Sequence, residues 1–111
     1  MPDFYFMTEN FLKLPEDLPL DFELFQQIIS NEKIVIERII SCGQQTPEGQ
    51  WLEDDRDEWV MLIQGRSVIS FQSGMSRELN PGDHLIIPKN SRHRVEKTST
   101  DPACIWIAVY Y

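Results

Sequence analysis

Histidine, cysteine and glycine are scarce in this sequence, and their scarcity excludes several kinds of active site. The 111 residues include two His, two Cys and five Gly. No glycine-rich phosphate-binding loop, clustered-cysteine zinc pattern or G-x-S-x-G nucleophile motif occurs. Cys42 and Cys104 lie far apart within apolar strand patterns, so buried free thiols are favoured over a disulfide. Free thiols fit a reducing compartment, and we expect a cytoplasmic protein.

Positive charge is also scarce, and no apolar run is long. Ten Lys and Arg stand against eighteen Asp and Glu, which gives a net charge of −8. That sign opposes binding to nucleic acid or to an anionic membrane surface. No apolar run approaches the roughly 18 residues that a transmembrane helix needs, and residues 1–4 lack the basic region of a signal peptide. The length predicts one domain with one core.

Residues 1–32 differ in pattern from the rest of the chain and are predicted to form an N-terminal arm. Beyond the turn-forming residues 14–19, apolar side chains recur at helical spacing, at Phe22, Phe25, Ile28 and Ile29. This spacing predicts a short amphipathic helix over about residues 19–30, closed by Asn31. We expect the arm to lie against the outside of the domain or across a partner subunit, because it carries further apolar residues: Phe4, Tyr5, Phe6, Phe11 and Leu12.

Residues 33–111 have the alternating pattern of β-strands and form the predicted main domain. A turn sequence at residues 80–83, Asn-Pro-Gly-Asp, is one of several turn signals between short apolar segments. Many short strands at this spacing are typical of an all-β sandwich or barrel. After a first strand near residue 34, strands are predicted over residues 58–64, 67–72, 75–79, 84–87, 92–98 and 103–110.

Two blocks within this domain resemble the two sequence motifs of the cupin family. The first cupin motif reads G-x5-H-x-H-x3/4-E-x6-G, and the second reads G-x5-P-x-G-x2-H-x3-N. Glu58 and Gly65 match the end of the first motif, and Gly82, Pro88 and His93 match the second. The resemblance covers roughly residues 35–110. It implies a double-stranded β-helix, or jelly-roll, barrel preceded here by the short helical arm.

The resemblance also implies where a metal ion would bind. In metal-binding cupins, the histidines and the glutamate of the two motifs hold a divalent ion beside open coordination positions. The paired histidines of the first motif are missing here. A three-residue gap before Glu58 places Asp54 and Leu52 at their positions, whereas a four-residue gap places Glu53 and Trp51 there. Asp54, Glu58 and His93 are therefore the predicted ligands of a divalent ion, which would be Mn, Fe, Ni or Zn.

Three functions stay open at this point. The first is a metal-dependent cupin, either an oxygenase or an isomerase. The second is a metal-free barrel that binds a small molecule, with Glu58 and His93 fixing its polar groups and Trp51 at the pocket wall. The third is a structural or interaction protein with a filled barrel. The cupin fold hosts all three classes, so we favour small-molecule binding and leave catalytic activity and catalytic residues undecided.

Two further expectations concern the surface. His84 is out of phase with Leu85 and Ile87, so it is expected to be structural or exposed. The strand at residues 58–64 is apolar on both faces. Small cupins pair through the outer face of one sheet, and the apolar residues that suit such a face predict a homodimer: Trp59, Met61 and Ile63.

Overall fold

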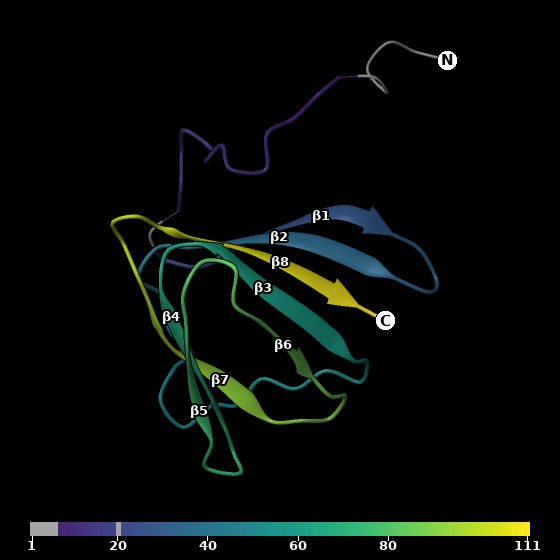
Figure 1. Ribbon diagram of the computed structural model, residues 1–111, viewed down its shortest axis with the longest axis vertical. Coiled ribbons are helices and arrows are strands. Elements are labelled where there is room, and N and C mark those ends of the chain that lie inside the picture. Colours follow the sequence, from purple (N-terminus) through teal and green to yellow (C-terminus); the bar gives the residue numbers. More distant parts are fainter. Residues whose placement is uncertain (1–6, 20) are drawn as a thin grey trace.

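The computed structural model describes residues 7–19 and 21–111 as eight strands in two antiparallel sheets, with no helix in these ranges (Figure 1). The all-β jelly-roll prediction is therefore confirmed. In this part of the chain no helix is long and apolar enough to cross a membrane. The larger sheet has the order β1 (Leu24–Ser30), β2 (Val35–Ser41), β8 (Cys104–Tyr110), β3 (Glu58–Gln64) and β6 (His84–Ile87); the smaller has the order β5 (Ser76–Leu79), β4 (Ser67–Phe71) and β7 (His93–Thr98).

The core lies between the two sheets, where alternate residues of each strand point inward. Leu62 of β3 and Cys104 of β8 are completely buried, and Trp106 of β8 is nearly so. They pack with Ile69 of β4 and Ile87 of β6, which come from opposite sheets. Burying one such Leu or Ile side chain stabilises the fold by about 1.5–3 kcal/mol. Both cysteines are free thiols, as the sequence predicts.

The helix predicted over residues 19–30 is wrong, because residues 24–30 form strand β1 along the edge of the larger sheet. Phe25 lies opposite Ile39, and a register shift between Gln27 and Ile29 then places Ile29 opposite Ile36. Such a bulge adds one residue to the strand, so its apolar residues depart from strict alternation and acquire a helix-like spacing. The i, i+3, i+4 spacing of residues 25, 28 and 29 is therefore produced by a bulged strand and not by a helix.

Asn31 ends strand β1 at a tight turn instead of closing a helix. Its side-chain Oδ1 accepts hydrogen bonds from the backbone N–H groups of Lys33 (2.8 Å) and Ile34 (2.9 Å). Its own N–H donates to the carbonyl of Ile34 at 3.0 Å. An Asn side chain that mimics a backbone turn in this way stabilises a hairpin as readily as it ends a helix.

The described part of the arm contacts the outer face of the larger sheet through Arg38 of β2. The Arg38 guanidinium donates to the carbonyls of Phe11 (3.1 Å) and Lys13 (2.8 Å) and lies 5.9 Å from the centre of the Phe11 ring. This segment thus lies against its own sheet, the first of the two expected placements. The apolar residues 4–6 lie outside the described part of the chain.

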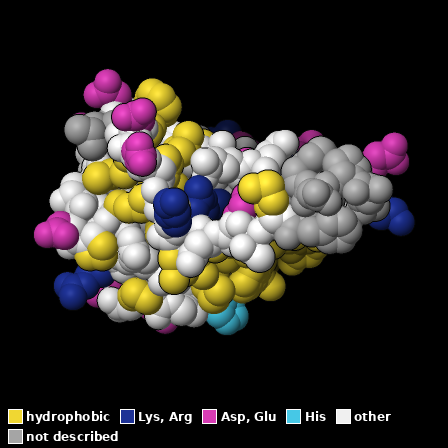
Figure 2. All heavy atoms as spheres, turned by 90° about the horizontal axis from the view of Figure 1, so that it is seen from above, with side chains coloured by type: hydrophobic (Ala, Val, Ile, Leu, Met, Phe, Trp, Pro, Cys, Tyr) yellow, Lys and Arg dark blue, Asp and Glu magenta, His cyan; other side chains and the backbone are white. Residues whose placement is uncertain are grey.

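The outer face of β3 and its neighbours is apolar and only partly covered. Trp59, Met61 and Ile63 are half-buried, and Ile86 of β6 is exposed. The exposed His84, expected to be structural or exposed, accepts a hydrogen bond at Nδ1 from the Trp59 Nε1–H at 3.1 Å. Figure 2 shows hydrophobic side chains along the lower edge of the view and a second group at the upper left. The partly covered outer face of β3 and β6 is the one that the predicted homodimer would bury.

Candidate ligand-binding site

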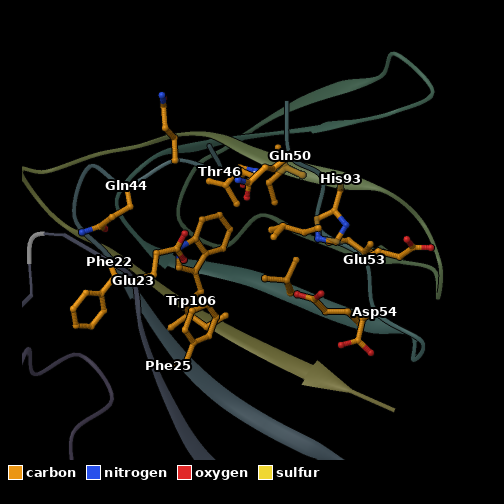
Figure 3. A pocket seen from close by; sticks show the side chains of 18 of the residues that line it. Phe22, Glu23, Phe25, Gln44, Thr46, Gln50, Glu53, Asp54, His93 and Trp106 are labelled. Carbon is orange, nitrogen blue, oxygen red and sulfur yellow. The ribbon is translucent and has the colours of Figure 1, made fainter. Parts of the chain in front are cut away.

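A cavity of about 530 Å³ opens between the two sheets at the end where β3 and β7 begin (Figure 3). Its volume falls within the roughly 300–1,000 Å³ of small-molecule sites. All five strands of the larger sheet and strands β4 and β7 of the smaller sheet contribute apolar side chains, and the loop over residues 44–54 closes one side. The apolar and aromatic lining comprises Phe22, Phe25, Ile39, Leu52, Val60, Ile69, Ile87, Val95, Trp106 and Tyr110.

Glu58 brings a carboxyl group to this cavity from the first position of β3. The strand pairs with β6 on one side and β8 on the other, which places Glu58 between Ile87 and Tyr110 and leaves it only 8% exposed. Among the described residues, no hydrogen bond or ion pair reaches its carboxyl group. Burial, and to a smaller extent the nearby carboxylates of Asp54 and Glu37, together raise the pKa of Glu58 to about 7.

His93 brings an imidazole to the same cavity from the first position of β7, and it is 6% exposed. Its Nδ1 lies 2.9 Å from the carbonyl oxygen of Ser91. A carbonyl only accepts, so Nδ1 carries a proton, and in a neutral imidazole Nε2 is then the acceptor. The backbone of His93 pairs with that of Leu52 through hydrogen bonds of 2.6 and 3.0 Å. This pairing ties the loop over residues 50–54 to β7.

Three donors in or behind the buried wall, on Trp106, Ser41 and Tyr110, already hydrogen-bond within the protein. Trp106 Nε1 donates to Ser41 Oγ at 3.2 Å, and the Ser41 hydroxyl donates to Glu23 Oε2 at 3.0 Å. Burial raises the pKa of Glu23, while the Ser41 hydrogen bond opposes that shift. Burial also raises the pKa of Tyr110; nearby carboxylates and a hydrogen bond to Glu37 add to this effect. These donors are therefore already committed within the protein.

Asp54 and Glu53 lie at the rim, where arginines partly neutralise them. Asp54 Oδ1 accepts from the backbone N–H of Arg56 at 2.9 Å and lies 3.5 Å from its Nε. Glu53 lies 3.4 Å from Arg92 Nε. The Asp54 carbonyl accepts from the N–H of Asn90 at 2.7 Å. Asn90 has a φ of 61°, the left-handed conformation that the glycine of the second cupin motif would adopt at this position.

The predicted site residues thus divide into two groups. Asp54, Glu58 and His93 all line the cavity. Trp51, predicted to stand at the pocket wall, is not among the lining residues; it is 37% exposed, and the centre of its ring lies 6.0 Å from the Arg94 guanidinium. Sequence reasoning missed Phe22 and Phe25 as pocket residues because it assigned them to a helix. The alternation of β8 does indicate Trp106 as a candidate wall residue, because it shares a face with Cys104.

The donor atoms as placed do not fit the predicted divalent metal ion. Within residues 7–19 and 21–111, no three or more His, Cys, Asp or Glu side chains form a group that could hold one. Leu52, at the position of a missing histidine, contributes an apolar side chain directly opposite His93. The Asp54 carboxylate is engaged by Arg56. Metal binding by Asp54, Glu58 and His93 stays a prediction from the sequence that this geometry does not favour.

Comparison with known proteins places these features in a family. The sequence model of the cupin domain matches residues 42–110. Among curated proteins, none matches the chain. A crystal structure from Ralstonia eutropha JMP134, of a protein provisionally named a mannose-6-phosphate isomerase, is 36% identical. The match covers 94% of this chain and 96% of that one, with a TM-score of 0.83.

More distant structures share the fold alone. An RmlC-like cupin family protein from Methanocaldococcus jannaschii, with a double-stranded β-helix fold, is 15% identical over 94% of this chain and 91% of that one, with a TM-score of 0.68. The DMSP lyase DddQ from Ruegeria pomeroyi DSS-3 is also 15% identical, with a TM-score of 0.70 over 88% of this chain and 50% of its own. The motif match, the jelly-roll topology and the 36% identical relative together show that this chain belongs to the cupin family.

Proposed function

We propose that this cupin barrel binds a small organic molecule directly in the cavity, without a metal ion between the protein and the ligand. Glu58 and His93 would hold the polar group of the ligand, and the aromatic wall would pack against its apolar part. The observation that carries this proposal is the Glu58 carboxyl group, which is buried, faces the cavity and has no hydrogen-bond partner among the described residues.

A buried carboxyl group without partners destabilises a fold, because charging it away from water costs free energy. A barrel with a purely structural role would gain stability from an apolar or amide side chain at this position. Residues that lower stability concentrate at functional sites, where the interaction they lack is made by a ligand. The cavity beside Glu58 supports this reasoning, because a filled barrel would leave no space there.

The metal-dependent alternative is less well supported by the geometry. It needs Asp54, Glu58 and His93 to converge on one ion, and the described residues contain no such group. Direct binding does not need this convergence, since a neutral or a charged carboxyl group forms hydrogen bonds with a ligand.

Binding can be tested with three probes that share one carbon skeleton: 2-phenylethanol, phenethylamine and phenylacetate. Titrations followed by ¹⁵N–¹H NMR, in the presence of EDTA, should show that at least one probe shifts the backbone amides of Glu58, Val60 and His93. The variants Glu58→Ala and His93→Ala should keep the folded spectrum and lose these shifts. If no probe perturbs the cavity amides, or if both variants bind as wild type does, the proposed function is wrong.

A further inference from the structure

We infer that the cavity selects an organic cation, namely an amine with an apolar or aromatic body, over anionic ligands such as carboxylates and phosphate esters. This inference rests on the proposed function and adds the chemical class of the ligand. It follows from the charges of the lining residues, from the direction of their hydrogen bonds, and from the layout of the cavity.

The charges of the lining are almost all of one sign. No Lys or Arg belongs to the described lining, and His93 is its only basic side chain. Each acidic group that lacks a close arginine leaves a negative potential in a space partly shielded from water, where it acts more strongly than in bulk solvent. The acidic lining residues are Asp21, Glu23, Glu53, Asp54 and Glu58.

The hydrogen bonds of the buried polar groups also favour a ligand that donates hydrogen bonds. Glu58 presents carboxyl oxygens, and a neutral His93 presents the Nε2 lone pair because its Nδ1–H donates to the Ser91 carbonyl. The Trp106 N–H donates to Ser41 and is therefore unavailable to a ligand. An ammonium group offers three donors and no acceptor, which complements such a surface. A carboxylate or phosphate offers only acceptors, so it would depend on neutral donors of the lining such as Gln45, Gln50 and Thr46, and it would face five acidic side chains.

The cavity also has an apolar end suited to the body of such a ligand. Figure 3 shows Phe22 and Phe25 at one end of the pocket, and His93 and Asp54 at the other, with Trp106 between them. Phe22 and Phe25 are 62% and 56% exposed, so their rings are available for contact with a ligand. A ligand whose apolar body packs on these rings would have its ammonium group toward the end with His93 and Asp54.

The name of the Ralstonia eutropha protein suggests an anionic ligand, which can be compared with the charges of the present cavity. Its provisional name refers to a sugar phosphate. A phosphate group in the present cavity would meet several carboxylates and, among the described lining residues, no Lys or Arg to bind it. The substrate suggested by that name therefore does not suit this chain.

The test compares the dissociation constants of the three matched probes at pH 8 by isothermal titration calorimetry. We expect wild-type protein to bind phenethylamine at least tenfold more tightly than 2-phenylethanol, and phenylacetate most weakly. Glu58→Gln removes the charge and keeps the shape, so it should weaken phenethylamine binding at least tenfold and leave 2-phenylethanol within twofold. Glu78→Gln changes the net charge equally, but Glu78 is exposed on β5 outside this cavity, so all three constants should stay within twofold.

The outcomes separate the two levels of the argument. If the alcohol or the carboxylate binds as tightly as the amine, the preference for cations is wrong, while ligand binding in the cavity stands. If Glu58→Gln and Glu78→Gln weaken amine binding equally, the preference reflects only the net charge of the protein, and the assignment to the cavity is overturned. If none of the probes binds, the proposed function itself fails.

Discussion

Replacing Glu58 with Gln should stabilise the protein at high pH and have little effect at low pH. The folded-state pKa of Glu58 is raised from 4.5 to about 7. Below about pH 4.5 the carboxyl group is protonated in both the folded and the unfolded protein, and the full stability is present. As the pH rises from about 4.5 through 7, the unfolded chain has released this proton while the folded protein still holds it, so the free energy of unfolding falls until the folded-state pKa is passed. A shift of this size amounts to about 3 kcal/mol well above pH 7.

Gln resembles the protonated carboxyl group in shape and carries no charge, so Glu58→Gln removes this penalty. Urea unfolding followed by tryptophan fluorescence should show that the variant exceeds wild type by about 2–3 kcal/mol at pH 8.5 and by less than about 0.5 kcal/mol at pH 4.5. In thermal melts the difference at pH 8.5 corresponds to roughly 10 °C. The exposed Glu78→Gln serves as the control and should match wild type at both pH values.

An equal difference at both pH values would show that Gln acts through packing, and would refute the reasoning. A variant less stable than wild type at pH 8.5 would also refute it, because Glu58 would then have a stabilising partner. That second result is the one expected if a bound metal ion compensates the carboxylate.

Three further predictions concern the fold and its surface. Gly65→Ala should lower the free energy of unfolding, measured in urea, by more than about 2 kcal/mol. Gly65 has a φ of 91°, and a Cβ at this position would lie 2.9 Å from Cys104 Cα. A smaller loss would show that the added methyl group is accommodated without strain. Arg38→Met should release the segment around residues 10–13 and speed its cleavage in limited proteolysis, because the carbonyls of Phe11 and Lys13 lose their donor; unchanged cleavage would show that other contacts hold the arm. The homodimer stays a prediction, and Met61→Glu should convert a dimer to a monomer in sedimentation velocity; a monomeric wild type would contradict it.

Most of the barrel could be predicted from the sequence because period-two alternation and turn residues act locally. The predicted strands over residues 58–64 and 84–87 coincide with β3 and β6. β1 could not be predicted, because its bulge becomes visible only when the strand is paired with β2. A helical pattern of apolar residues and a bulged edge strand look alike in a single sequence.

The candidate site could also be predicted only in part, because local sequence patterns reveal its motif residues and not its long-range contacts. Glu58 and His93 each begin a strand after a turn, so motif spacing alone indicates that they meet at one end of the barrel. The contacts of Trp106 with Ser41, and of Ser41 with Glu23, join segments far apart in the sequence. No local pattern reveals them. Trp51 lies in a loop, where no periodicity fixes the direction of a side chain.

The central claim, direct binding without a metal ion, is tested most directly by metal content. Untagged wild type and His93→Ala should be incubated with Mn, Fe, Ni and Zn, passed over a desalting column and measured side by side by plasma mass spectrometry. The proposal predicts well below one equivalent of metal in both proteins. Nearly stoichiometric metal in wild type that is lost in His93→Ala would contradict it, and would establish a carboxylate-rich metal site at Glu58 and His93.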